Sequence, residues 1–185
     1  MIIIGITGTL GAGKGTVGEY LVSEYGFKHF SAREFIADEI VRRGFPVNRD
    51  TLTEVSNDIR AENHPGFILE QLYARALKHG GSSVIESVRT PGEIQTLKKK
   101  GVFYLLAVDA DPKVRYERVI LRKSATDQVS FDKFMLDEKR EMESTDPNKQ
   151  NIAACVKQAD FVINNDGNLK DLHTQVDTIM KKLQA

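Results

Sequence analysis

The chain has 185 residues, and its 26 basic side chains are balanced by 26 acidic ones. This balance gives no overall field that would attract nucleic acid or an anionic membrane, so the composition argues against both as partners. A chain of this length can bury the core of a single domain, here residues 1–185, without disulfide support. The lone Cys155 and the lack of a basic, apolar leader favour a cytoplasmic protein.

Five strand-like segments, several of them rich in Val and Ile, predict buried strands. They are Ile2–Thr7, Phe27–Phe30, Ser83–Ser87, Phe103–Val108 and Phe161–Asn164. Amphipathic segments predict helices at Thr16–Tyr25, Ala32–Arg43, Asp50–Glu62, Gly66–His79, Pro91–Lys99, Pro112–Arg122, Phe131–Glu143, Asn148–Gln158 and Leu169–Leu183. This alternation predicts a three-layer α/β/α fold around a parallel five-stranded sheet. Ligands in such folds bind beyond the carboxyl ends of the strands, so polar residues that follow a strand are candidates for a site.

The first strand is followed by a glycine-rich segment that nearly spells a phosphate-binding loop, Gly-Thr-Leu-Gly-Ala-Gly-Lys-Gly-Thr. Between a strand and a helix, such a turn directs backbone N–H groups and the positive end of the helix at an anion. Lys14 adds a point charge for the terminal phosphates, and Thr16 offers Mg²⁺ a hydroxyl one residue later than usual. We therefore expect ATP to bind Gly8, Gly11, Ala12, Gly13, Lys14, Gly15 and Thr16. A glycine-rich turn with a chance lysine is the alternative.

Residues after the second and third strands are candidates for a second, phosphate-bearing substrate. Ser31 and Arg33 follow the second strand, and Arg60 lies on a predicted helix further along; Ser31 could equally be only a helix N-cap. Glu86 closes the third strand, where a carboxylate can hold Mg²⁺ or its water shell, and Arg89 comes three residues later. A solvated carboxylate, or an ion pair with Arg89, is the alternative for Glu86.

Arginines recur at helical spacing after the fourth strand. Arg115, Arg118 and Arg122 share one helix face, which could converge on a polyphosphate, and the last two are the better placed. A solvated charged face is the alternative. After the fifth strand, Asn165 and Gly167 lie in a predicted turn beside which an adenine ring could rest.

Together these motifs resemble P-loop kinases of the nucleoside monophosphate kinase type, similar to adenylate kinase and dephospho-CoA kinase. The resemblance spans the chain from Gly8 to Gly167 and includes the Gly-Lys-Gly-Thr form of the loop. It implies that Arg118 packs on the ATP base and that Arg122 meets its phosphates. On the acceptor side, it implies that Arg89 contacts the acceptor phosphate and that Glu86 belongs to the metal shell. Glu93 stands where the family has the glutamine that reads the acceptor base.

The resemblance also implies a short lid at about 123–130 without a zinc site, with Arg140 as the lid-side arginine. Residues 31–79 would form the acceptor-binding insertion. The expected reaction moves the γ-phosphoryl group of Mg·ATP to a nucleoside or deoxynucleoside monophosphate. The residues expected to be catalytic are Lys14, Arg89, Arg118, Arg122 and Arg140.

Two other functions stay open at this point. A dephospho-CoA kinase-like enzyme would phosphorylate another small molecule, although Ser31-Ala32-Arg33 stands where those relatives place an aspartate. An acceptor-independent ATPase or assembly factor would use the same loop but transfer to water. The sequence decides neither the acceptor nor the oligomeric state.

Overall fold

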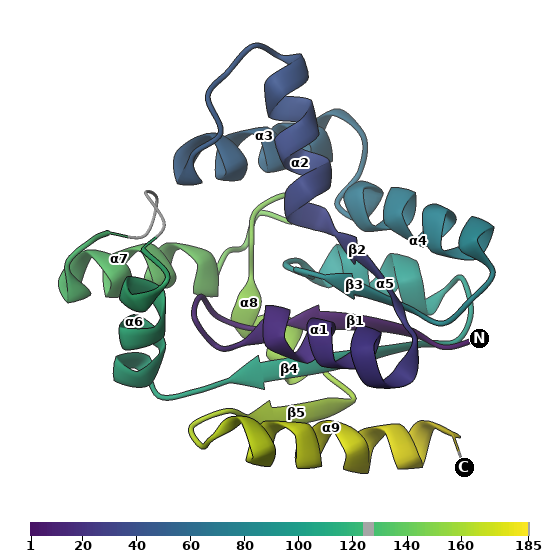
Figure 1. Cartoon of the computed structure of the whole chain (residues 1–185). Coiled ribbons are helices and arrows are strands. Elements are labelled where there is room, and N and C mark those ends of the chain that lie inside the picture. Colours follow the sequence, from purple (N-terminus) through teal and green to yellow (C-terminus); the bar gives the residue numbers. More distant parts are fainter. Residues whose placement is uncertain (124–127, 185) are drawn as a thin grey trace.

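The computed structural model describes residues 1–123 and 128–184, in which a parallel five-stranded sheet lies between layers of helices (Figure 1). The strands are β1 (Ile3–Thr7), β2 (Lys28–Ser31), β3 (Ser83–Glu86), β4 (Phe103–Asp109) and β5 (Phe161–Asn164), in the order β2-β3-β1-β4-β5. The helices are α1 (Lys14–Tyr25), α2 (Ala32–Arg42), α3 (Arg49–Glu62), α4 (Phe67–His79), α5 (Pro91–Lys98), α6 (Pro112–Leu121), α7 (Phe131–Met142), α8 (Ile152–Lys157) and α9 (Leu169–Gln184). The predicted three-layer α/β/α fold is confirmed.

The predicted elements occur close to their predicted bounds, with two informative differences. Helix α1 begins at Lys14, two residues early, because the left-handed residue that ends the loop is Gly13, with φ of 99°. Helix α8 begins at Ile152, four residues later than predicted. The side chain of Asn151 accepts a hydrogen bond from the backbone N–H of Ala154 and so caps the helix there.

Alternate side chains of β1 enter two separate cores. Ile3 packs in one core, which includes side chains of α4 and α5. Ile4 and Ile6 pack in the other, beneath α1 and α9. Because both faces of the central strand are covered, β1 is buried along its whole length.

The sheet order places the glycine-rich loop at the centre of the molecule. Strand β1 pairs with β3 on one side and β4 on the other, so the chain after β1 emerges where the direction of winding reverses. Helices α2 and α3 stand above this edge, and α6 and α7 lie beside it (Figure 1). In the described part of the chain, no helix is both long and apolar enough to cross a membrane. Half of the expected lid, residues 124–127, lies outside the described residues.

Candidate functional site

The loop between β1 and α1 is fixed by its own glycines and by neighbouring strands. Gly8 and Gly13 have positive φ angles of 137° and 99°. A Cβ at Gly8 would overlap the carbonyl oxygen of Val108, and one at Gly13 would overlap the side-chain amide of Asn165. Asn165 also donates from Nδ2 to the carbonyl of Ala12, at 2.8 Å. The turn after β5 therefore supports the loop directly.

Two glycine substitutions in this loop are expected to differ sharply. Gly8→Ala should lower the free energy of unfolding by about 2 kcal/mol, because the left-handed backbone and the Val108 carbonyl both oppose a Cβ. Gly15→Ala is the matched control, since a Cβ there meets no neighbouring atom within 4 Å, and should stay within about 1 kcal/mol of the wild type. Urea denaturation followed by circular dichroism measures both. Equal losses would contradict this account of the loop.

Lys14 begins α1 with a side chain that folds back onto the loop. Its Nζ donates to the carbonyl oxygens of Gly8, at 3.0 Å, and Thr9, at 2.8 Å. The residue is only 8% exposed. An ammonium group has three N–H donors, so one remains for a ligand in the adjoining cavity.

Burial lowers the pKa of Lys14 to about 7. Four charged side chains also act on this pKa: Arg89 and Arg122 lower it, and Glu86 and Glu141 raise it. A bound anion would favour the charged ammonium, so anion binding near neutral pH should be accompanied by proton uptake at Lys14.

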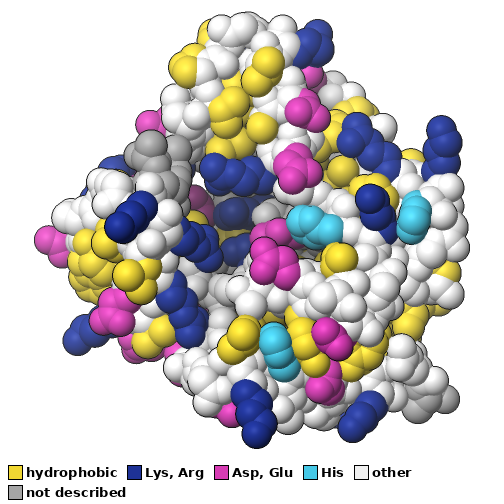
Figure 2. Space-filling model, in the orientation of Figure 1, with side chains coloured by type: hydrophobic (Ala, Val, Ile, Leu, Met, Phe, Trp, Pro, Cys, Tyr) yellow, Lys and Arg dark blue, Asp and Glu magenta, His cyan; other side chains and the backbone are white. Residues whose placement is uncertain are grey.

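A cavity of about 530 Å³ opens beside Lys14, and Figure 2 shows it as a hollow with basic side chains on its walls. The loop contributes Gly11, Gly13, Lys14, Gly15 and Thr16 to the lining. The opposite wall includes Arg33 and Ile36 of α2 and Arg49, Leu52, Thr53, Ser56 and Arg60 of α3. Its lining holds six basic and three acidic side chains, whereas the whole chain is neutral. The cavity is therefore suited to anions.

Three of the predicted acceptor residues line this cavity: Arg33, Arg60 and Arg89. Ser31 does not line it, because its hydroxyl caps α2 by accepting a hydrogen bond from the N–H of Glu34 at 3.2 Å. Of the two interpretations of Ser31, the helix cap is the one the structure shows.

The expectation that Glu93 contacts the acceptor base is wrong. Glu93 is completely buried and accepts hydrogen bonds from Arg60 Nε and Nη2, at 3.2 and 3.0 Å. Its other oxygen accepts from the backbone N–H groups of Arg89 and Thr90, at 2.7 and 3.0 Å. Glu93 thus neutralises Arg60 and holds the segment after β3.

Glu86 lies at the cavity wall with an oxygen 3.1 Å from Nε2 of His29. Burial alone would raise the pKa of this carboxyl, but His29 and Lys14 outweigh it and the pKa is lowered. In the parts of the chain that are described, no three His, Cys, Asp or Glu side chains gather as a metal site. Mg²⁺ needs only one or two protein oxygens when phosphates supply others, so Thr16 and Glu86, which line one cavity, fit it.

A second cavity, of about 320 Å³, lies on the other side of the loop. It is lined by Gly13, Thr16, Arg118, Arg122, Asn165, Gly167, Leu169 and Leu172. Nη2 of Arg118 donates to the Gly167 carbonyl at 3.5 Å, while its buried Nη1 has no hydrogen-bond partner among residues 1–123 and 128–184. The structure therefore brings together the residues predicted to surround the ATP base, and it separates Arg118 from Lys14.

Arg140 is not brought to either cavity. Its side chain is 63% exposed, and its Nη1 lies 3.7 Å from Oδ1 of Asp137. The structure corrects the expectation of a catalytic Arg140, because in this arrangement α7 turns that side chain toward solvent.

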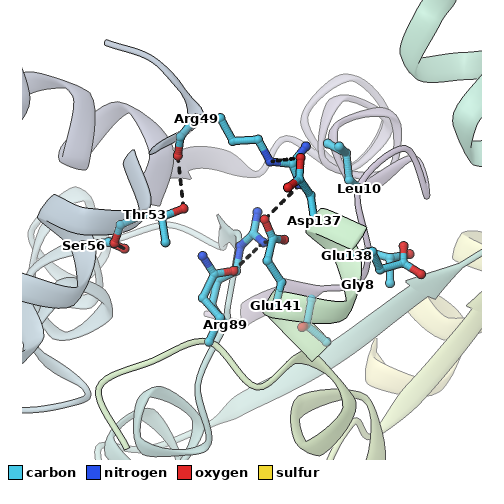
Figure 3. Close-up of polar contacts among 12 residues, drawn as sticks. Gly8, Leu10, Arg49, Thr53, Ser56, Arg89, Asp137, Glu138 and Glu141 are labelled. Carbon is cyan, nitrogen blue, oxygen red and sulfur yellow. Dashed lines mark hydrogen bonds and ion pairs between the residues drawn. The ribbon is translucent and has the colours of Figure 1, made fainter. Parts of the chain in front are cut away.

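Arg49, Glu141 and Gln150 also line the cavity but were not among the predicted site residues. Figure 3 shows Arg49 and Glu141 near Arg89. One signal for Arg49 was available, since Arg49, Thr53, Ser56 and Arg60 are spaced as one stripe on a helix. Glu141 carried no such signal, because it sits in a run of charged residues typical of a solvated helix face.

Comparisons with known proteins agree with this architecture. The model of a family described as AAA domain matches residues 4–146. A UPF0200 protein from Pyrococcus abyssi is 28% identical over 188 residues, covering 98% of this chain and 97% of the relative. A shikimate kinase from Acinetobacter baumannii, solved with shikimate, has a TM-score of 0.65 at 16% identity, covering 100% of this chain and 95% of that one. A gluconokinase from Sinorhizobium meliloti has a TM-score of 0.57 at 14% identity, covering 98% of this chain and 93% of that one. These likenesses show a P-loop kinase-like fold.

Proposed function

The chain belongs to the AAA domain family, and from this premise we propose that it transfers the γ-phosphoryl group of Mg·ATP to a nucleoside or deoxynucleoside monophosphate. One observation carries the proposal. The two cavities meet at Gly13, Thr16 and Arg122, so a donor nucleotide and a second anion can reach the same point of the loop. Transfer to water would need no second chamber with basic walls.

The donor would span both cavities. Its base would rest against Arg118 and the Asn165–Gly167 turn, and its phosphates would meet the loop, Lys14 and Arg122. Thr16 and Glu86 would hold Mg²⁺, which when bound neutralises charge on the donor phosphates.

The acceptor would occupy the larger cavity, with residues 31–79 as its binding segment. Arg33 and Arg89 would contact its phosphate, and Leu52 and Ile36 offer apolar surface to the rest of the molecule. Arg60 would contribute shape more than charge, because Glu93 neutralises it.

A phosphate acceptor makes small chemical demands on the protein. Its oxygen is already anionic near neutral pH, so it attacks the γ-phosphorus without a general base. The new P–O bond forms as the bond to the β,γ-bridging oxygen breaks, and ADP leaves with that electron pair. Lys14 and Arg122 would stabilise the charge on the transferring group, and positioning would supply the rest.

The test is ADP release from Mg·ATP with each ribo- and deoxynucleoside monophosphate, with dephospho-CoA, and with no acceptor. We expect one monophosphate to raise ADP release at least tenfold and to yield an equal amount of diphosphate. Stimulation by dephospho-CoA alone would replace the proposed acceptor. Turnover that no acceptor changes would make the protein an ATPase and contradict the proposal.

Arg89→Ala should raise the KM of the acceptor about tenfold or more, because it removes a charge-assisted hydrogen bond to the acceptor phosphate. The KM of ATP should change less than threefold. Arg42→Ala is the control, since Arg42 lies on the surface and pairs with Glu39. Initial-rate kinetics with each substrate varied in turn measures the split. Equal increases in both KM values would contradict the placement of Arg89.

A further inference from the structure

Arg49 and Arg89 are joined on the wall of the larger cavity by Glu141 (Figure 3). Oε1 of Glu141 accepts from Arg49 Nη2 at 3.0 Å, and Oε2 accepts from Arg89 Nη1 at 2.9 Å. Gln150 Oε1 accepts from the same Nη1 at 2.8 Å. Arg49 lies on α3, Arg89 after β3, Glu141 on α7 and Gln150 before α8, so the fold assembles this group from distant parts of the chain.

In the described part of the chain, each arginine has N–H groups that are not used in hydrogen bonds to the protein. Within the described ranges, Arg89 makes its side-chain hydrogen bonds through Nη1 alone, so Nε and Nη2 remain. Arg49 uses Nη2, and its Nε lies 4.0 Å from Asp137 Oδ2, beyond hydrogen-bond distance. Since both residues line the cavity, these remaining N–H groups are available to a ligand with several oxygen acceptors.

Glu141 is held in place. Its side chain is 16% exposed, and α7 is anchored by the buried Phe134 and by the pairing of Glu138 with Arg115. Burial alone would raise the pKa of Glu141, but Arg89 and Arg49 outweigh it and the pKa is lowered. The carboxylate therefore stays ionised between the two guanidiniums.

The charges of the group leave a net attraction for anions. Two arginines and one glutamate give a local charge of about one positive unit. Asp137 adds little to this balance, because its carboxylate is paired with Lys133 Nζ at 2.6 Å and lies 3.7 Å from Arg140. A planar guanidinium pair with free donors matches the oxygens of a phosphate.

We propose that Arg49 and Arg89 form a clamp for the phosphate of the acceptor, and that Glu141 is the positioning residue that holds the two guanidiniums together. The inference rests on the proposed function in one respect, that the bound phosphate belongs to the acceptor. It adds Arg49 as an acceptor-binding residue. Without the Glu141 carboxylate, the two like charges would repel and their free donors would diverge.

The clamp can be tested by calorimetry, without phosphoryl transfer. The full-length protein is first saturated with an ATP analogue that has an imido group between its β and γ phosphorus atoms, which fills the loop. Inorganic phosphate is then titrated, with acetate as a carboxylate probe in a parallel titration. The variants are Arg49→Met and Glu141→Gln. Arg42→Met and Glu143→Gln are matched controls, because the first alters a surface arginine and the second removes a charge from the exposed end of α7.

Phosphate should bind the loaded wild type, and each variant of the clamp should weaken it about tenfold or more. The controls should stay within twofold, and affinity for the ATP analogue should change less than threefold in all four proteins. Weaker phosphate binding with nearly unchanged affinity for the ATP analogue would distinguish a local effect on the clamp from general damage to the fold. If Glu141→Gln does not fold, Arg49→Met still decides whether the clamp binds phosphate.

Three results would overturn the clamp: no phosphate binding to the loaded wild type, binding of acetate but not phosphate, or tighter phosphate binding by Glu141→Gln. The last would mean that Glu141 competes with the ligand. The outcome is distinguishable from failure of the proposed function. If phosphate binding depends on the clamp but no acceptor stimulates ADP release, the proposed phosphotransferase is overturned and the clamp stands. If an acceptor stimulates ADP release but its KM is unaffected by Arg49→Met, the phosphotransferase stands and the clamp is overturned.

Discussion

Lys14→Met is expected to lower phosphoryl transfer by about 10³-fold while leaving the protein folded. The ammonium of Lys14 is a buried charge beside the cavity, and removing such a preorganised donor removes stabilisation from the charge that develops in the transition state. Single-turnover transfer of the γ-phosphoryl group measures the loss. Appreciable turnover by the purified variant would contradict the role given to Lys14.

The same variant should change how stability depends on pH. Lys14 loses its proton near pH 7 in the folded protein but near 10.5 when unfolded, so between these values the unfolded state binds more protons. The free energy of unfolding of the wild type, minus that of Lys14→Met, should therefore be flat below pH 7 and rise from about pH 7 to 10. The neighbouring charges of Arg89, Arg122, Glu86 and Glu141 are the same in both proteins.

Urea denaturation at a series of pH values measures this difference. Lys78→Met is the control, because Lys78 is an exposed residue of α4 and its difference from the wild type should not vary over this range. If the free energy of unfolding of the wild type minus that of Lys14→Met stays constant or falls as the pH rises, the buried amine does not titrate near neutrality.

Glu93→Ala is expected to cause the largest loss of stability, about 3–5 kcal/mol, because it leaves the Arg60 charge buried without a partner. Arg60 is 2% exposed, so water cannot take over from the lost carboxylate. The backbone N–H groups of Arg89 and Thr90 lose their acceptor as well. Chemical denaturation of both proteins measures the effect.

A double-mutant cycle separates the ion pair from the other contacts of Glu93. Arg60→Met should lower the free energy of unfolding much less in a Glu93→Gln background than in the wild type, because in that background Arg60 has already lost its charged partner. Glu62→Ala is the surface control; Glu62 pairs with Arg43 at 3.3 Å but is largely exposed, and its loss should be below about 1 kcal/mol. Additive effects of the Arg60 and Glu93 substitutions would contradict the buried pair.

Much of the fold was predictable because its signals are local. Short strand-like runs, several of them rich in Val and Ile, marked the five strands of the described sheet, and each helix was found within a few residues of its bounds. The glycine-rich loop was recognisable because Gly8, Gly11 and Gly13 adopt positive φ angles, which other residues rarely adopt. Prediction was weakest at α8, where a single asparagine side chain sets the first residue of the helix.

The site was predictable where residues follow a strand directly. The order of a parallel sheet places the ends of β1 and β3 side by side, so Lys14, Glu86 and Arg89 had to line one cavity. The prediction failed for Glu93 and Arg140, which lie on helices, and Ser31, at the end of β2, caps a helix and does not line the cavity. Each helix that follows a strand has one face that is buried and one that is exposed. The position of a charged residue in the sequence does not by itself say on which face it lies.

The sequence by itself determined the strands, the helices and the phosphate-binding loop, because each depends on residues a few positions apart. The alternation of these strands with helices was enough to predict their parallel arrangement. Only the tertiary structure decided the partners of the charged side chains. Glu93 meets Arg60 across 33 positions, and Glu141 meets Arg89 across 52 and Arg49 across 92. Whether a carboxylate contacts a ligand, neutralises a buried arginine or spaces two cavity arginines depends on burial and on such distant partners. That is why Glu93 and Glu141, both glutamates on helices, differ in what they do.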